Sequence, residues 1–550
     1  MSPRNTGFRS FRHEGWLLLF VVVWFAMLGY RDLAEPDEGR YAEIPREMVA
    51  SGDWVTPRLN DFKYFEKPVL QYWATAATFL AFGESNLTAR LPVAVAGFLG
   101  ALWIFYVGNR LWGREAGICA FLVLLSSTLY TVLGHFITLD MMLSVFLAVG
   151  VGALLLAQSE RSDPLGVRNW MLLGWAVLGL ATLTKGLVAL VLPGGAILLY
   201  TLWQRDWALW RHLHLGKGIL LLLLISAPWF VAVSLANPEF PQFFFIHEHF
   251  DRYTSEVHKR NQAMWYYLPI LLAGLLPWLG TGFRALFSAG NHWRPDSPNH
   301  FDAVRFLWSL VLFTLVFFSL GRSMLPPYIL PLFPALALIM GRRLALGVSV
   351  VADLAILFGM GVFCLVFSGI NELFVSPKLP LAYLEAYGYW AMAAAVVFMT
   401  GGWLTWRFYG TRGWRAVAGI SLTALLGVQL LTWGYQELGA ARTSRALADV
   451  VRPLADEGAR VFGANFYPQS LPFYLGQTIQ LAMTTSELDM GIRMEPGKLI
   501  PSWDEFAKQW QQEEQAVSVF ERKDFQRLGG DRIPGRVIYQ DPRKLAVARR

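Results

Sequence analysis

The chain has 550 residues, of which 55% are hydrophobic and only 16% are charged. A soluble domain usually carries about a quarter charged residues, so this composition excludes an ordinary soluble protein. The 47 basic and 40 acidic residues give a net charge of +7, and the sequence contains no basic run typical of nucleic-acid binding, so nucleic acid is not an expected partner.

Apolar stretches close to 20 residues long recur between residue 16 and about residue 433, and each can cross a hydrocarbon core about 30 Å thick. Cytoplasmic loops carry an excess of Lys and Arg, so the basic loops predict thirteen spans, with the N-terminus in the cytoplasm and the C-terminus outside. The predicted spans are residues 16–30, 88–109, 117–136, 140–158, 169–184, 187–203, 218–235, 264–283, 306–320, 327–341, 346–370, 383–405 and 416–433.

The first external loop, about residues 31–87, is predicted to be long and structured. Residues 68–83 are apolar but short, and counting them as a span would put Arg110 and Arg114 outside. We therefore expect an interfacial or re-entrant helix there. Residues 40–54 are charged and amphipathic, which predicts a second helix lying on the membrane.

The tail from residue 434 alternates between predicted helices and short strands. Helices are expected over 442–456, 467–475 and 503–512, and strands over 460–464, 516–520 and 536–539. The predicted fold class is thus an all-α polytopic membrane protein of about 13 helices (residues 1–433), followed by a small extracytoplasmic α/β domain (residues 434–550).

Several ionisable residues fall on the predicted external side. Asp140 and Lys185 each lie in a short turn between apolar stretches, and ionisable groups at such positions are usually functional. Carboxylates alone would suggest a metal or a proton path, whereas lysines and arginines beside them indicate phosphate binding. A lipid phosphate would place its phosphate at this depth and its tail between helices.

The first external loop also carries a resemblance to a known family. The sequence E-P-D-E-G-R-Y-A-E-I-P-R-E-M (35–48) resembles the first-loop signature of polyprenyl-phosphate-sugar-dependent glycosyltransferases with the GT-C fold, a group related to protein O-mannosyltransferases. D-W-V-T-P-R-L-N (53–60), F-E-K-P-V-L-Q-Y-W (65–73) and A-R-L-P (89–92) continue it. The sequence is most similar to lipid A 4-amino-4-deoxy-L-arabinose transferases, through H-F-I-T-L-D (135–140), T-K-G (184–186), E-H-F-D-R-Y (248–253) and P-P-Y-I-L-P (326–331).

This resemblance implies an inverting transfer of 4-amino-4-deoxy-L-arabinose from undecaprenyl phosphate to a lipid A phosphate. The reaction would take place at the periplasmic face of the bacterial inner membrane and give resistance to polymyxin and cationic peptides. The expected partners are the lipid-linked donor, lipid A and membrane lipids, and the chain is expected to be a monomer.

The resemblance also implies roles for individual residues. Asp37 and Asp140 are the predicted catalytic residues, with Asp37 acting as a base or orienting the acceptor. Lys185, Arg58 and Arg252 are predicted to bind the donor phosphate. The predicted acceptor-binding residues are Lys67, Lys63, Arg322 and Tyr328.

Relatives with this fold often use a divalent metal, so Zn²⁺, Mg²⁺ or Mn²⁺ is a candidate cofactor. Glu66 with His247 or His249 could ligate it, because carboxylates and imidazoles are ordinary ligands. The alternative is that these histidines are interfacial and hydrogen-bond to loop backbone.

Three other functions stay open at this point. A transferase acting on protein or another glycan would need a real base, since a hydroxyl is not ionised at pH 7. A lipid-linked sugar transporter would be expected to gather charge at the midplane, whereas here the charges gather at one face. A structural membrane scaffold would leave Asp140 and Lys185 without a role.

Overall fold

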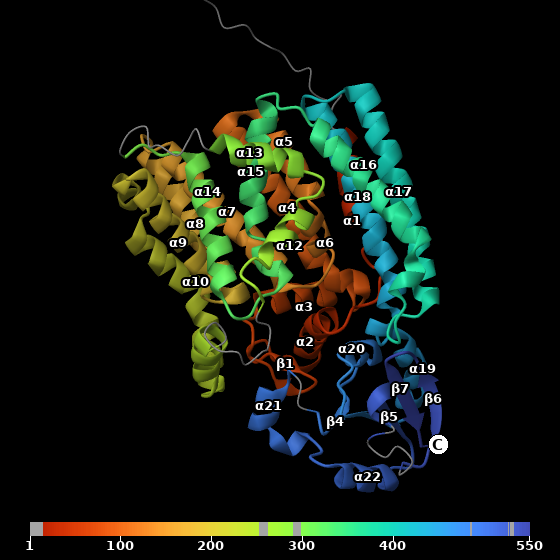
Figure 1. Cartoon of the computed structure of the whole chain (residues 1–550). Helices are drawn as coiled ribbons and strands as arrows, with labels where there is room; N and C mark the ends of the chain where they lie inside the picture. Colours follow the sequence, from red (N-terminus) through yellow and green to blue (C-terminus); the bar gives the residue numbers. More distant parts are fainter. Residues whose placement is uncertain are drawn as a thin grey trace, which may run out of the picture.

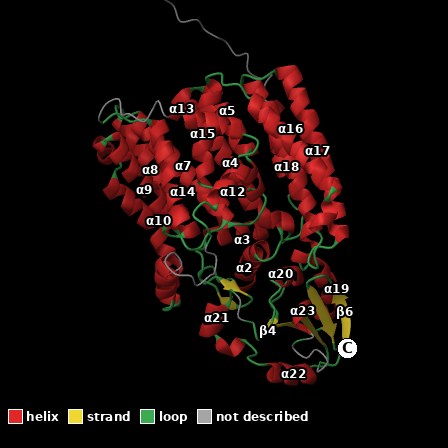
Figure 2. Ribbon diagram, viewed as in Figure 1, coloured by secondary structure: helices red, strands yellow, loops and turns green. Residues whose placement is uncertain are grey.

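The computed structural model describes residues 15–251, 262–289, 299–484, 487–525, 527 and 533–549. A bundle of long helices forms one part, and a small α/β domain covers one end of it (Figures 1 and 2). The bundle helices are α1 (Gly15–Phe25), α4 (Asn86–Trp112), α5 (Arg114–Ser126), α6 (Thr128–Leu133), α7 (Leu139–Ser159), α8 (Pro164–Lys185), α9 (Val188–Gln204), α10 (Leu215–Ala236), α12 (Tyr267–Gly274), α13 (Leu279–Ala289), α14 (Ala303–Leu320), α15 (Leu332–Ala345), α16 (Val351–Gly369), α17 (Leu381–Tyr409) and α18 (Trp414–Gly439).

Seven helices of the described residues are long and apolar enough to cross a membrane, or eight if α12 and α13 form one bent span. The chain is therefore a multi-pass membrane protein. Each of the thirteen predicted spans contains a helix, but the number that actually crosses stays a prediction. Two predicted spans are broken, since residues 117–136 divide into α5 and α6 at Ser127, and residues 264–283 bend by 117° between α12 and α13.

Two helices of the first loop lie between the bundle and the α/β domain (Figure 1). They are α2 (Asp37–Ser51) and α3 (Leu70–Phe82), with the short hairpin of β1 (Arg58–Leu59) and β2 (Phe62–Lys63) between them. With 13 residues, α3 is about 20 Å long and too short to span a bilayer. This agrees with the prediction that residues 68–83 do not cross.

The helix predicted over residues 40–54 is present as α2, but its predicted place on the membrane surface was wrong. Every residue from Glu38 to Met48 is buried within the protein. Buried charges are tolerated when they are paired. Glu38 pairs with Arg90, and Glu43 pairs with Arg46, so the charged side chains of α2 have partners inside the protein.

The α/β domain is built on a five-stranded mixed sheet of order β4-β3-β5-β7-β6. Its strands are β3 (Arg460–Ala464), β4 (Gln480–Ala482), β5 (Ala516–Glu521), β6 (Arg536–Gln540) and β7 (Lys544–Ala548), and its helices are α19 (Arg445–Asp456), α20 (Leu471–Leu475), α21 (Asp489–Met494), α22 (Trp503–Gln512) and α23 (Arg522–Phe525). β3 runs parallel to β4 and β5, and β7 runs antiparallel to β5 and β6. The predicted strands β3, β5 and β6 and the predicted helix α22 are confirmed, while β4 and β7 were not predicted.

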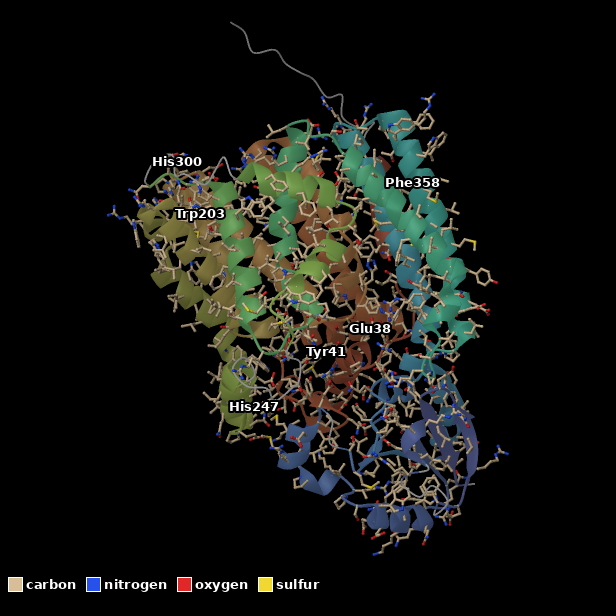
Figure 3. All side chains as sticks on the ribbon, in the orientation of Figure 1. Glu38, Tyr41, Trp203, His247, His300 and Phe358 are labelled. Atoms are coloured by element: carbon tan, nitrogen blue, oxygen red, sulfur yellow. The ribbon has the colours of Figure 1, made fainter. Side chains whose placement is uncertain are left out.

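The two ends of the bundle differ in what they carry. His247 lies at the end that faces the α/β domain, and Trp203 and His300 lie at the opposite end (Figure 3). Loops predicted to be cytoplasmic pair with one another, through Arg110 with Glu160 at 2.6 Å and Arg161 with Asp206 at 2.5 Å. The loops predicted to be cytoplasmic thus form ion pairs with one another.

Candidate active site

A cavity of about 1260 Å³ opens between the bundle and the α/β domain. Elements far apart in sequence line it: the start of α2, the segment before α3, the start of α7, the end of α8, the π-helix η2 (Gln242–Asp251), the 3-10 turn η4 (Pro326–Ile329) and α21. Charged side chains of both signs and tyrosines face the cavity, so it can hold a polar, anionic group.

Asp140 and Lys185 meet at the inner side of this cavity. α7 and α8 are consecutive antiparallel neighbours, so the start of α7 and the end of α8 lie at the same end of the bundle. Asp140 is the second residue of α7 and Lys185 the last of α8, positions at which the helix dipoles favour an anion and a cation respectively. Lys185 Nζ donates to Asp140 Oδ1 and lies 4.5 Å from the centre of the Tyr328 ring. The sequence prediction that these residues share one site agrees with this geometry.

Asp37 begins α2, and its side chain is 55% exposed to the cavity. Arg40, one turn later, is almost fully buried and donates to Asp37 Oδ1 at 2.8 Å and to the Tyr64 hydroxyl at 3.0 Å. Arg40 also pairs with Glu487 of the α/β domain at 2.8 Å. Burial alone would lower the pKa of Arg40, but Tyr64 and Tyr41, followed by Glu487 and Asp37, raise that pKa well above its ordinary value. Arg40 is therefore a permanent cation beside Asp37.

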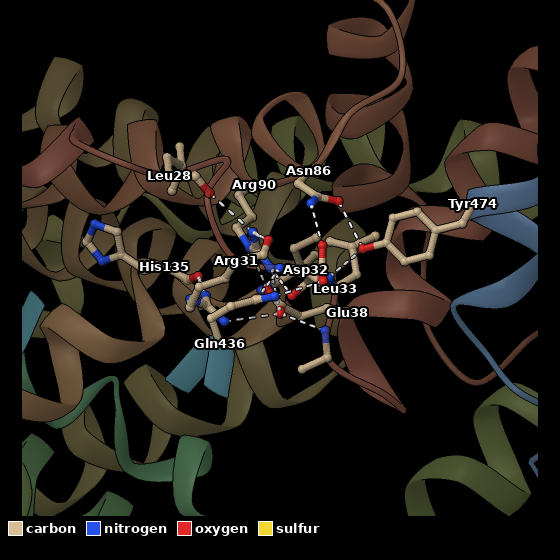
Figure 4. A network of polar contacts seen from close by, with 12 residues as sticks. Leu28, Arg31, Asp32, Leu33, Glu38, Asn86, Arg90, His135, Gln436 and Tyr474 are labelled. Carbon is tan, nitrogen blue, oxygen red and sulfur yellow. Dashed lines mark hydrogen bonds and ion pairs between the residues drawn. The ribbon is translucent and has the colours of Figure 1, made fainter. Parts of the chain in front are cut away.

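A network of polar contacts around Glu38, the residue after Asp37, fixes the start of α2 (Figure 4). Arg90 of α4 donates to both carboxylate oxygens of Glu38, at 2.8 and 2.9 Å, and also to the backbone oxygens of Arg31 and Asp32. Burial alone would raise the pKa of Glu38, but Arg90 and Arg31 outweigh burial and hold the pKa below its ordinary value. Glu38 is thus a charged anchor, and it holds its neighbour Asp37 at the cavity wall.

Glu66, Lys67 and His247 also line the cavity. Lys67 Nζ donates to Glu248 at 3.1 Å and to the backbone oxygen of Glu66 at 2.7 Å. Among the described residues, no group of three or more His, Cys, Asp or Glu side chains is placed to hold a metal ion. The predicted metal site of Glu66 with His247 or His249 stays a prediction. The side chain of His249 is outside the described residues.

Some predicted site residues do not line this cavity. Arg58 pairs with Glu495 at 3.2 Å, and Lys63 pairs with Glu239 at 2.6 Å. Neither residue lines this cavity, so the predicted phosphate-binding roles of Arg58 and Lys63 stay predictions. Arg322 is not among the lining residues, and Arg252 lies outside the described residues.

The sequence reasoning did not assign Arg40, Tyr41 or Glu487 to the site. Asp37 and Arg40 are three residues apart, a spacing that could have indicated the pair if the predicted helix had begun at Asp37 instead of Arg40. Glu487 is 447 positions from Arg40, and no local pattern relates them.

A second cavity of about 1120 Å³ adjoins the first and is lined mostly by apolar side chains of α6, α16, α17 and α18, such as Phe363 and Leu431. Pro36, Asp37 and Thr138 line both cavities. A polar chamber thus opens into an apolar one at Asp37. The fold and the site together define a membrane-embedded enzyme suited to a substrate with an anionic head and a long apolar tail.

Comparisons with known proteins identify the family. The model of the family "Dolichyl-phosphate-mannose-protein mannosyltransferase" matches residues 15–244, and the model of the family "Aminoarabinose transferase C-terminal domain" matches residues 447–549. The chain is 31% identical over 497 residues to the undecaprenyl phosphate-alpha-4-amino-4-deoxy-L-arabinose arabinosyl transferase of Shewanella sediminis, covering 88% of each chain. It is 34% identical to the protein of the same name from Edwardsiella ictaluri, over 76% of each chain.

A solved structure agrees with these relatives. The crystal structure of ArnT from Cupriavidus metallidurans bound to undecaprenyl phosphate matches with a TM-score of 0.90 and 36% identity, over 98% of each chain. The chain belongs to the undecaprenyl phosphate-aminoarabinose arabinosyl transferase family and is a glycosyltransferase. The resemblance drawn from the first-loop motifs is confirmed.

Proposed function

We propose that this protein transfers 4-amino-4-deoxy-L-arabinose from undecaprenyl phosphate to a phosphate group of lipid A. The observation that carries the proposal is the junction of the two cavities at Asp37. A polyprenyl-phosphate sugar has a long apolar tail, a phosphate and a polar sugar, and the apolar cavity followed by the polar one matches that order. The names of the similar arabinosyl transferases support the choice of sugar and lipid.

In this proposal, Lys185 binds the donor phosphate. Its ammonium group lines the polar cavity, and Asp140 and Tyr328 hold it in position. As the bond between the anomeric carbon and the phosphate oxygen breaks, both bonding electrons stay with the phosphate. The ammonium group of Lys185 stabilises this developing charge, so no acid needs to protonate the leaving oxygen.

The acceptor approaches the opposite face of the sugar in an inverting displacement. A lipid A phosphate is already ionised near neutral pH, so one of its oxygens can attack the anomeric carbon without first losing a proton. Lys67 is a second cation that lines the same cavity, and it is suited to hold this second phosphate. Asp37 then acts through its position and charge beside the sugar, and the rate comes mainly from holding two membrane-anchored reactants together.

The proposed reaction takes place at the periplasmic face of the inner membrane. The cavity end of the bundle and the α/β domain would face the periplasm, and the protein would act in the inner membrane as a monomer. An added amino sugar neutralises the negative charge of a lipid A phosphate, which weakens attraction for polymyxin and other cationic peptides.

The test uses purified protein, undecaprenyl phosphate-aminoarabinose and two forms of lipid A, one with its phosphates and one without them. We expect transfer to the phosphorylated form alone, measured by mass spectrometry of the product. Equal transfer to the dephosphorylated form would refute the phosphate acceptor and favour a hydroxyl acceptor, as in a protein-glycosylating enzyme. No transfer to either form, with a protein that is folded and binds donor, would refute the proposed reaction.

A further inference from the structure

We propose that Glu487 of the α/β domain is a positioning residue for Asp37 and acts on it through Arg40. The inference rests on the proposed function and gives the α/β domain a part in the reaction. This domain would then form a fixed wall of the active site, with one carboxylate that orients the residues of α2.

The guanidinium group of Arg40 connects the two carboxylates. Its Nη1 lies 2.8 Å from Glu487 Oε2 and donates to the Tyr64 hydroxyl at 3.0 Å, while its Nη2 donates to Asp37 Oδ1 at 2.8 Å. A guanidinium is planar with a fixed fork of donors, so two partners on Nη1 set the direction in which Nη2 points. Glu487 and Tyr64 together therefore aim Nη2 at Asp37.

The burial of the three charged groups supports this order of action. The Arg40 side chain is only 5% exposed, whereas the side chains of Glu487 and Asp37 are 27% and 55% exposed. Of these three side chains, that of Asp37 is the most exposed to solvent, and it faces the reactants. Because it is half exposed, packing alone does not fix its carboxylate, and the hydrogen bond from Arg40 holds it in position.

The carboxylate of Glu487 is itself held in position by a neighbouring side chain. Gln469 Nε2 donates to Glu487 Oε2 at 2.9 Å. The backbone of residues 469 and 470 packs directly on α2, because a Cβ added at Gly39 would lie 2.7 Å from the Ser470 backbone nitrogen. This close approach holds the segment that carries Gln469 against the helix that carries Asp37.

Two other contacts fasten the α/β domain to the first loop. Lys544 of β7, which is 1% exposed, pairs with Glu35 at 3.3 Å. The Asn60 side chain exchanges two hydrogen bonds with the backbone of Ile479, at 2.8 and 2.9 Å. The contact between Arg40 and Glu487 is thus not needed to attach the domain, so its loss should affect the geometry of Asp37 more than the stability of the fold.

The experiment compares Glu487→Gln, Glu487→Asp and a matched control, Glu513→Gln. Glu513 also pairs with an arginine of the α/β domain, Arg460, at 2.8 Å, but lies outside the cavity. We expect Glu487→Gln to lower kcat at least tenfold while KM for the donor stays within twofold and Tm stays within about 2 °C. Glu487→Asp should recover part of the lost kcat, and Glu513→Gln should match the wild type.

Two results would overturn the inference. A kcat of Glu487→Gln within twofold of the wild type would show that Asp37 does not depend on Glu487. A fall in kcat that accompanies an equal loss of folded protein, with no recovery in Glu487→Asp, would assign Glu487 a merely structural role. Transfer by the wild type is measured first and tests the proposed function by itself, whereas the ratio of variant to wild type tests Glu487.

Discussion

Replacement of Lys185 with alanine tests the role of its ammonium group, which lines the polar cavity. If its ammonium group stabilises the leaving phosphate, its removal should cost about 2.7–4 kcal/mol of transition-state stabilisation, the usual range for one preorganised electrostatic contact. We therefore expect kcat to fall about 10²- to 10³-fold. Lys498→Ala is the matched control, because Lys498 pairs with Asp61 at 2.7 Å and does not line the cavity. It should keep activity within about threefold of the wild type.

The same replacement also affects stability, and the two effects need to be separated. Asp140 is only 7% exposed, so loss of Lys185 leaves a largely buried carboxylate without its partner. Removing one member of a buried pair costs about 3–5 kcal/mol, which can lower the amount of folded protein. The double variant Lys185→Ala/Asp140→Asn removes both charges, so it should regain stability without regaining activity.

The assay is transfer of radiolabelled aminoarabinose to lipid A by equal amounts of folded protein in detergent or nanodiscs, with Tm measured on the same samples. Lys185→Ala within tenfold of the wild type would refute the role of Lys185 in stabilising the leaving phosphate. Activity that returns in the double variant would show that the single variant had failed through instability.

Four further predictions follow from the site and the fold. Asp37→Asn should retain measurable turnover with lipid A phosphate, whereas a loss of about 10²–10⁴-fold in kcat would show that a proton is removed and that the acceptor is a hydroxyl. Cysteines at Gly113 and Asp61 should react with impermeant reagents from opposite sides of the membrane, and labelling from one side would contradict the topology. The pKa of Glu38 is depressed in the folded protein, so its pairing with Arg90 stabilises the fold above the ordinary carboxyl pKa of about 4.3, and this stabilisation is lost as the pH falls through the folded-state pKa. The Tm of the wild type should therefore fall on acidification. A Glu38→Gln variant should have a lower Tm at pH 7, and its Tm should fall less on acidification. EDTA tests the predicted metal site: loss of turnover that Zn²⁺, Mg²⁺ or Mn²⁺ restores would support ligation by Glu66 with His247 or His249, and full turnover in EDTA would contradict it.

Much of the fold could be predicted because hydropathy and helical length are local properties of the sequence. The positions of Asp140 and Lys185 were also predictable, since consecutive antiparallel helices bring the start of one next to the end of the other. The first-loop motifs identified the family, which composition and periodicity alone could not have done.

Long-range pairing explains what could not be predicted. Residues 40–54 have the charge pattern of a surface helix, but α2 is buried because partners for its charges come from α4 and the α/β domain. Arg58 pairs with Glu495 and Lys63 pairs with Glu239, 437 and 176 positions away, and no local pattern in the sequence predicts such pairs.

Mass spectrometry of lipid A from living cells tests the central claim most directly. A bacterial strain that lacks its own aminoarabinose transferase but makes the lipid-linked donor would express this chain, its Lys185→Ala variant or neither. The account predicts lipid A whose phosphate carries aminoarabinose only in cells with the wild-type chain. Unmodified lipid A in those cells, with the protein present and folded in the inner membrane, would contradict it.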